Sequence, residues 1–258
     1  MNIVHAIILA IVEGVSEFLP ISSTGHLILA GKLLGIQNSE FTKSFEIFIQ
    51  LGAIMAVGTL YWSRIWKNPA MIKPLLIAFL PTGILGVLLY KTIKTLFTAD
   101  ILVAVMLATI GLLLIMLEKY WKQHPARTNN TIMTLSPKQL LSIGLFQSFS
   151  MVPGVSRAAA TIVGGMFMGL SRVEAVEFSF LLAVPTMAAA TGLDLIKNMD
   201  VITQSGNLIL LSVGFIVSWI VSLVVMKAFL RWVKHATFTS FGVYRICVSF
   251  VYLLIVRG

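Results

Sequence analysis

Six apolar stretches, each about long enough to cross the ~30 Å hydrocarbon core of a bilayer as a helix, constrain the fold of this chain more than any other feature. They run over residues 45–61, 74–90, 101–117, 178–195, 208–226 and 241–256. Hydrophobic residues make up 58% of the chain, charged residues 11%, and the mean hydropathy is +0.95, which excludes a soluble globular domain. Because backbone polar groups in lipid must be bonded within the protein, the sequence predicts an all-α polytopic membrane protein.

The charge of the chain fits a membrane protein better than a nucleic-acid-binding protein. The formal net charge is +9, but the basic residues are scattered in short loops between the apolar stretches. We therefore expect no nucleic-acid partner. The single cysteine, Cys247, excludes an intrachain disulfide and a cysteine-based zinc cluster. The N-terminal stretch MNIVHAIILA has no basic n-region, so we expect the first apolar segment to be retained.

Two further apolar regions are interrupted by polar residues, proline and glycine. The first interruption is EGVSEFLPISSTGH, residues 13–26, and the second is QSFSMVPGVSRAAAT, residues 147–161. Neither half of either region is long enough to span a bilayer. Each is predicted to be a re-entrant helix–break–helix hairpin that enters and leaves on one side of the membrane. A bilayer tolerates such breaks and ionisable groups only where protein or a wet cavity surrounds them.

The two hairpins are also related by an internal repeat. A shift of 134 positions places Glu13 on Gln147 and Ser22 on Ser156, and nearby shifts align the apolar stretches that follow. Each half then consists of one re-entrant hairpin and three transmembrane helices. Three crossings is an odd number, so the second half is expected to be inverted relative to the first. In this inverted-topology repeat, the functional site is expected where the two breaks meet.

We expect a single membrane domain whose orientation follows from its loop charges. Its parts are repeat 1 (about 1–118), a cytoplasmic linker (about 119–138) and repeat 2 (about 139–258). Eleven basic loop residues lie on one predicted side and six on the other. The more basic side is assigned to the cytoplasm, which puts both termini outside. The first hairpin then opens outward and the second inward.

Glu13 and Glu17 are separated by four residues, so both carboxylates project from one face of a helix. Like charges at that spacing repel each other, and more strongly in a medium of low dielectric. A divalent cation would compensate them, and oxygen ligands without a nearby thiol favour Mg²⁺ or Ca²⁺. The alternative is that this helix end lies at the membrane interface and both carboxylates are solvated.

Ser22, Ser23 and Thr24 follow Pro20 at the first break, and His26 lies just beyond them. Hydroxyls in this position commonly cap the next helix. One of them is also a candidate nucleophile, with His26 as the general acid or base that takes its proton. The spacing leaves open whether the nucleophile is Ser22, Ser23 or a water held by the carboxylates. His26 has the alternative of a purely structural role.

Arg157 lies in the second break, where a guanidinium requires an anionic partner. Its fork matches phosphate oxygens, and Gly154 lets backbone N–H groups approach an anion at the start of a helix. Ser156 and Thr161 add hydroxyl donors. The alternative is an ion pair between Arg157 and one of the two glutamates. A carboxylate pair, hydroxyls, a histidine and an arginine together suit hydrolysis of a phosphate ester or anhydride that carries a long apolar tail.

The whole chain resembles the undecaprenyl-diphosphate phosphatase family, also known for bacitracin resistance. The resemblance rests on EGVSEFLPISSTGH, FEIFIQLGAIMAV, PGVSRAAATIVGG and EFSFLLAVP. It implies hydrolysis of a C55 polyprenyl diphosphate to the monophosphate at the outer face of the bacterial inner membrane, which recycles the cell-wall lipid carrier. It also favours a homodimer. The competing reading is a polyprenyl-phosphate transporter or flippase, because inverted repeats with broken helices are typical of transporters.

The family motifs indicate which residues form the site. The residues expected to be catalytic are Glu13, Glu17, Ser22, Ser23 and His26, with Glu13 and Glu17 also as metal ligands. The residues expected to bind phosphate are Thr24, Gly154, Ser156, Arg157 and Thr161. The chain departs from the family at Ala158, where a serine usually follows the arginine. This loss removes a hydroxyl and gives more weight to Ser156 and Thr161.

Overall fold

The structure is a computed structural model that describes residues 1–37, 39–89, 92, 93, 96, 100–123, 130–197 and 207–257. Within these residues the chain is helical, with one isolated parallel bridge between Asn130 and Leu170. The helices are α1 (Ile3–Ser16), α2 (Ser23–Leu33), α3 (Glu40–Lys67), η1 (Pro69–Met71), α4 (Ile72–Leu88), α6 (Asp100–Gln123), α7 (Pro137–Ser148), η2 (Phe149–Met151), α8 (Arg157–Phe167), α9 (Arg172–Lys197), α11 (Asn207–Trp232) and α12 (Thr239–Arg257). The all-α prediction is confirmed.

Five helical segments in the described residues are long and apolar enough to cross a membrane. They are Glu40–Lys67, Pro69–Leu88, Ile101–Gln123, Arg172–Gly192 and Asn207–Trp232, which coincide with the first five predicted spans. The second predicted span ends at residue 90, outside the described residues. The sixth predicted span lies in α12, whose apolar part, Thr239–Ile255, is shorter than the other five. The chain is therefore a multi-pass membrane protein by the length and composition of its helices.

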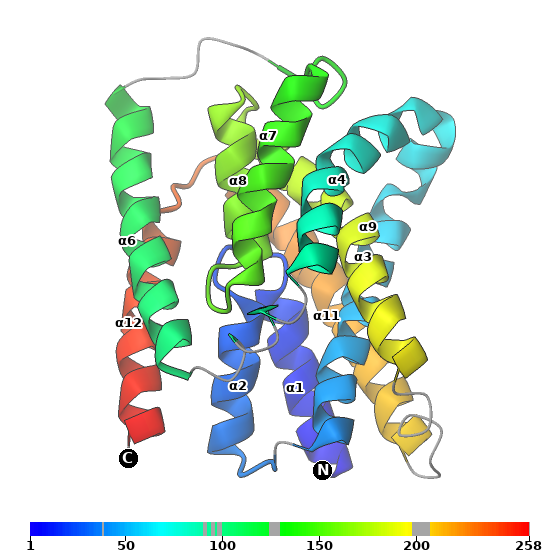
Figure 1. Cartoon of the computed structure of the whole chain (residues 1–258), viewed down its shortest axis with the longest axis vertical. Helices are drawn as coiled ribbons and strands as arrows, with labels where there is room; N and C mark the ends of the chain where they lie inside the picture. The colour runs from blue at the N-terminus through cyan, green and yellow to red at the C-terminus, as the bar shows by residue number, and fades with distance from the viewer. Residues whose placement is uncertain are drawn as a thin grey trace.

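The two interrupted regions form helical hairpins at opposite ends of the molecule. Helices α1 and α2 have their outer ends near both chain termini, whereas α7 and α8 have theirs at the other end, and the two breaks lie near the middle (Figure 1). Asn2 caps α1 by accepting a hydrogen bond from the His5 N–H. Ser136 and Gln139 form a capping box at the start of α7. The predicted linker, 119–138, includes residues 124–129, which lie outside the described residues.

Close backbone contacts hold the longer helices together. Helix α6 lies alongside α12, and a Cβ atom added to Gly111 would lie 2.7 Å from the Gly242 carbonyl oxygen. Helix α3 contacts α11 in the same way, because a Cβ atom on Gly52 would lie 2.4 Å from the Phe215 carbonyl oxygen. Small residues at such contacts commonly mediate helix association in lipid. Moving an apolar side chain from lipid to a helix interface gives little hydrophobic free energy, so close backbone packing becomes important.

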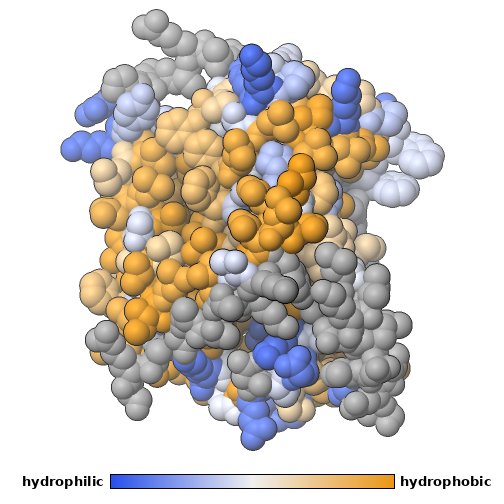
Figure 2. All heavy atoms as spheres, viewed as in Figure 1, coloured by the Kyte–Doolittle hydropathy of each residue, from blue (hydrophilic) through white to orange (hydrophobic). Residues whose placement is uncertain are grey.

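Apolar side chains also cover the outside of the bundle. An apolar band crosses the face seen in Figure 2, and hydrophilic residues gather toward its two ends. On α4 the outward residues include Ile84, Val87 and Leu88, which are 58–73% exposed. This pattern is expected of a surface that lies against lipid. The buried core runs through α9, where Phe178, Phe180 and neighbouring residues are fully enclosed.

Candidate active site at the meeting of the two breaks

The two breaks have the same unusual backbone conformation immediately before a helix. Ser22 precedes α2 with φ of 74°, and Ser156 precedes α8 with φ of 78°. Within the described residues these are the two non-glycine residues in the left-handed region. Such a conformation costs about 1–3 kcal/mol and persists only where the surroundings enforce it, so it is commonly found at functional sites. The Ser156 hydroxyl also caps α8 by accepting from the Ala159 N–H at 3.2 Å.

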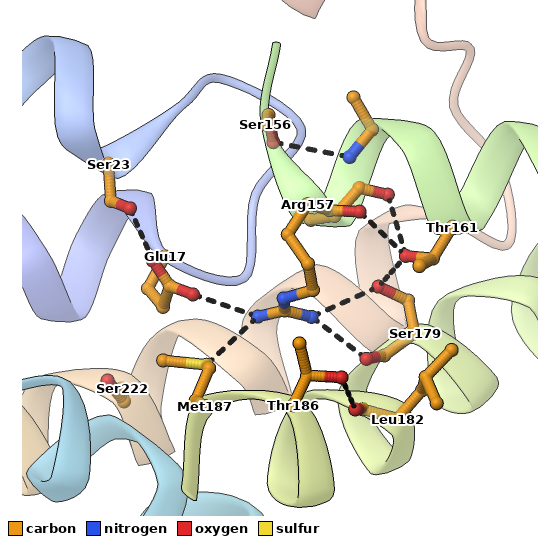
Figure 3. Close-up of polar contacts among 12 residues, drawn as sticks. Glu17, Ser23, Ser156, Arg157, Thr161, Ser179, Leu182, Thr186, Met187 and Ser222 are labelled. Atoms are coloured by element: carbon orange, nitrogen blue, oxygen red, sulfur yellow. Dashed lines mark hydrogen bonds and ion pairs between the residues drawn. The ribbon is translucent and has the colours of Figure 1, made fainter. Parts of the chain in front are cut away.

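An ion pair joins the first break to the second. Arg157, the first residue of α8, places Nη2 3.0 Å from Oε1 of Glu17, and the two side chains are 9% and 8% exposed (Figure 3). The other Glu17 oxygen, Oε2, accepts a hydrogen bond from the Ser23 hydroxyl. Both oxygens of Glu17 are therefore occupied. The sequence left two glutamates, Glu13 and Glu17, as possible partners of Arg157. In the structure Arg157 pairs with Glu17.

Helix α9 holds the other side of the Arg157 guanidinium. Nη1 donates to the Ser179 carbonyl oxygen at 2.9 Å and contacts the Ser179 hydroxyl at 3.4 Å (Figure 3). The Phe18 ring lies 5.5 Å from the guanidinium carbon, within the range of a cation–π contact. Nε is buried and has no hydrogen-bond partner. The guanidinium is thus held between Glu17 and Ser179, and its Nε keeps unused donor capacity.

Thr161 supports this arrangement from one turn further along α8. Its hydroxyl contacts the Ser179 hydroxyl at 2.7 Å and lies 2.9 Å from the Arg157 carbonyl oxygen. Thr161 and Ser179 are both fully buried. Ala158 is fully buried as well, so a serine in its place would need a partner inside the protein. Ser179 was not singled out from the sequence, because one serine within an apolar helix carries no local signal.

Glu13 lies one turn before Glu17 on α1 and is fully buried. Neither of its carboxylate oxygens has a hydrogen-bond partner. A buried carboxylate without a partner is costly, and a cation or a proton would remove that cost. Within the described residues no group of three or more His, Cys, Asp or Glu side chains is arranged to hold a metal ion. Glu13 therefore has the free ligand atoms that a cation requires, whereas the oxygens of Glu17 already have partners.

His26 is turned toward α12 rather than toward the glutamates. Its Nδ1 lies 2.8 Å from the Ser22 carbonyl oxygen, and its Nε2 lies 2.8 Å from the Tyr244 hydroxyl. Because a carbonyl oxygen only accepts, Nδ1 is the donor, and Nε2 of the neutral ring accepts the Tyr244 proton. The two rings are also stacked, with centroids 5.6 Å apart. Tyr244 was not identified from the sequence.

The remaining predicted site residues, Ser22, Thr24 and Gly154, also lie at the two breaks. Ser22 is buried and its side chain makes no capping hydrogen bond, and Thr24 is half-buried in the first turn of α2. Gly154 has φ of 93°, and a Cβ atom there would lie 2.6 Å from the Val103 carbonyl oxygen. Glycine is required at this position because both the conformation and the contact with α6 exclude a side chain.

Sequence comparisons identify the relatives of the chain. Residues 6–251 match the family model described as bacitracin resistance protein BacA. Curated proteins called undecaprenyl-diphosphatase are similar along nearly the whole length. The protein of Wolinella succinogenes is 47% identical over 253 residues, 98% of each chain. The protein of Sulfurihydrogenibium sp. is 50% identical over 256 residues, 98% of this chain and 99% of the other. The family resemblance predicted from the motifs is confirmed, and the chain belongs to the bacitracin resistance protein BacA family.

Proposed function

We propose that this chain is an integral-membrane phosphatase that hydrolyses undecaprenyl diphosphate to undecaprenyl phosphate and inorganic phosphate. The observation that carries the proposal is the buried contact of Arg157 with Glu17, which in turn accepts the Ser23 hydroxyl. This contact supports a site in which Arg157 would bind the anion beside Ser23 as the nucleophile and Glu17 as the base. The name of the curated relatives supports the same reaction.

The diphosphate would bind at Arg157. A phosphate oxygen is a better match for the guanidinium fork than a single carboxylate oxygen, so substrate would replace Glu17 as a partner of Arg157. The free Nε is available for a second contact with the same phosphate group. Thr24, Gly154 and Ser156 would line the phosphate from the two breaks. Thr161 would act by fixing Ser179, and through it the orientation of Arg157.

Ser23 is the nucleophile that the geometry favours over Ser22 or water. Its hydroxyl already donates to Glu17, so its proton has an acceptor when the oxygen attacks the terminal phosphorus. The new Ser23 O–P bond would form as the bond to the bridging oxygen breaks, and undecaprenyl phosphate would leave. Water would then hydrolyse the phosphoserine. Release of Arg157 to the substrate strengthens Glu17 as a base, because its compensating charge is withdrawn.

A divalent cation, Mg²⁺ or Ca²⁺, would be held by Glu13, with Glu17 as a second ligand once Arg157 has turned to the phosphate. The unpartnered Glu13 oxygens support this assignment. A bound cation would supply charge neutralisation on the phosphate oxygens. His26, fixed by Tyr244 and the Ser22 carbonyl, would relay protons at the edge of the site.

The membrane arrangement is proposed from the helices and the loop charges together. The chain forms one domain of two inverted repeats, about 1–118 and 139–258, joined by a cytoplasmic linker at about 119–138. The re-entrant hairpins enter from opposite faces, in agreement with their positions at opposite ends of the bundle (Figure 1). Both termini and the opening of the site face the outside of the bacterial inner membrane. Release of the carrier monophosphate there would confer bacitracin resistance, and the working form would be a homodimer.

The second candidate function is transport of a polyprenyl phosphate across the membrane. Two hairpins that meet from opposite ends favour it, since this is a transporter arrangement. Transport requires anion recognition by Arg157 but neither a nucleophile nor a base. The hydrogen bond from Ser23 to Glu17 therefore favours hydrolysis.

Phosphate release by the purified chain from undecaprenyl diphosphate tests the proposal directly. We expect release by the wild-type chain, inhibition by chelator, and loss of release in Ser23→Ala. A wild-type chain that releases no phosphate yet moves labelled lipid across vesicles would refute hydrolysis in favour of transport. Activity that survives a chelator would refute the cation role alone.

A further inference from the structure

Arg245 is a fully buried arginine in the first half of α12 that the proposed chemistry does not use. Within the described residues no carboxylate lies within ion-pair distance of its guanidinium. Burying a charge is expensive, and a lipid-exposed arginine would extend toward the membrane surface instead. Arg245 extends inward, so its surroundings must compensate the charge with hydrogen bonds.

Within the described residues the acceptors of Arg245 are backbone carbonyl oxygens, which come from both breaks and from α6. Nη1 donates to the carbonyl of Pro20 in the first break at 3.0 Å. Nη2 donates to the carbonyl of Gly154 in the second break and lies 3.3 Å from that of Val155. Nε donates to the Leu107 carbonyl of α6 at 3.3 Å. One guanidinium thus joins segments more than 130 positions apart in the chain.

The carbonyls of Pro20, Gly154 and Val155 need an outside donor because the helices are interrupted where they lie, whereas Leu107 lies inside the continuous helix α6. In a helix each would accept from an N–H four residues further on, and a break removes that partner. A hydrogen bond from a charged donor is stronger than one from a neutral donor. The planar guanidinium has five donors in a fixed fork, so it also sets the distance between the breaks.

We propose that Arg245 is a positioning residue that fixes the two breaks relative to each other, so that Glu17 and Ser23 of one meet Arg157 of the other. The inference rests on the proposed phosphatase function for its catalytic consequence only. Arg245 touches no reacting group and acts through the carbonyls of Pro20 and Gly154. A lysine would keep the charge but offers one nitrogen, which cannot reach both carbonyls in the same geometry.

Three variants test this role. Arg245→Lys keeps the charge and loses the fork. Arg245→Met removes both the fork and the charge. It therefore provides a second variant that can be measured if a buried lysine prevents folding. Ser249→Ala is the matched control, because Ser249 lies one turn further on α12 and donates only to the Ala104 carbonyl of α6. For each, amide hydrogen exchange is measured over residues 17–23 and 152–157 in detergent, together with Tm, kcat and KM.

We expect the backbone amides of both breaks to exchange at least about 10-fold faster in both Arg245 variants than in the wild type. The kcat should fall roughly 10- to 100-fold, whereas KM should change less than about 3-fold. Ser249→Ala should leave both breaks unchanged. Unchanged exchange in either break of the Arg245 variants, or equal effects in the control, would overturn the inference. Absence of phosphate release by the wild type would refute the phosphatase proposal separately, since the exchange measurement does not depend on it.

Discussion

The ion pair between Glu17 and Arg157 makes a quantitative prediction about stability. Both side chains are more than nine-tenths buried, so removing one partner leaves the other as an uncompensated charge. Arg157→Met alone and Glu17→Leu alone are each expected to cost about 3–5 kcal/mol. The double variant replaces the pair with apolar side chains and should cost far less than the sum, because no charge then remains buried.

Thermal unfolding of the purified variants in detergent measures this coupling. At roughly 2–4 °C per kcal/mol for a chain of this size class, each single variant should lower Tm by roughly 6–20 °C, and the double variant should recover most of that loss. Lys43→Met is the control, since Lys43 pairs with Glu40 at the surface, where the side chains are 52% and 68% exposed. Its Tm should stay within about 2 °C of the wild type.

The outcome that refutes the reasoning is additivity. If the two single losses sum to the loss in the double variant, Glu17 and Arg157 do not depend on each other, and the ion pair is not the link between the breaks. Phosphate release separates stability from function in the same variants. All three should lose at least about 100-fold in rate at temperatures where they remain folded, because each lacks the anion-binding Arg157, the base Glu17, or both.

Four further predictions follow from individual contacts. Ser23→Ala should lower kcat at least about 100-fold, whereas Ser22→Ala should lower it far less, because Ser23 is the one of the two serines that donates to Glu17. Single-turnover phosphate release distinguishes the two variants, and equal losses would contradict the assignment. Glu13→Gln should abolish stimulation by Mg²⁺ or Ca²⁺ without loss of folding, and a metal titration that matches the wild type would argue against a Glu13 ligand. Tyr244→Phe should lower kcat several-fold with Tm unchanged, because His26 loses its Nε2 partner; full activity would make that contact dispensable. Gly52→Leu should lower Tm by roughly 5 °C or more, since its side chain would force α3 away from α11, and an unchanged melting curve would contradict the close approach.

The positions of the helices could be predicted from local sequence patterns. Apolar length predicted the five spans, and proline, serine and glycine within apolar runs predicted both breaks to within a few residues. These features depend on near neighbours in the chain, since a bilayer requires each backbone segment to satisfy its own hydrogen bonds. The sixth predicted span, 241–256, falls within α12, although the apolar part of that helix in the described residues, Thr239–Ile255, is shorter than the five long segments. The motifs were equally local, and they led to the family that the comparisons confirm.

The sequence by itself determined that this chain would fold as a helical membrane protein with two polar breaks, and which residues those breaks would carry. Only the tertiary structure decided that Glu17, rather than Glu13, pairs with Arg157, that His26 turns to Tyr244, and that Arg245 joins the breaks. Spacing along one helix places both glutamates on one face and cannot choose between them. The choice is made where the two breaks meet each other and contact α9 and α12, which brings together residues more than 130 positions apart.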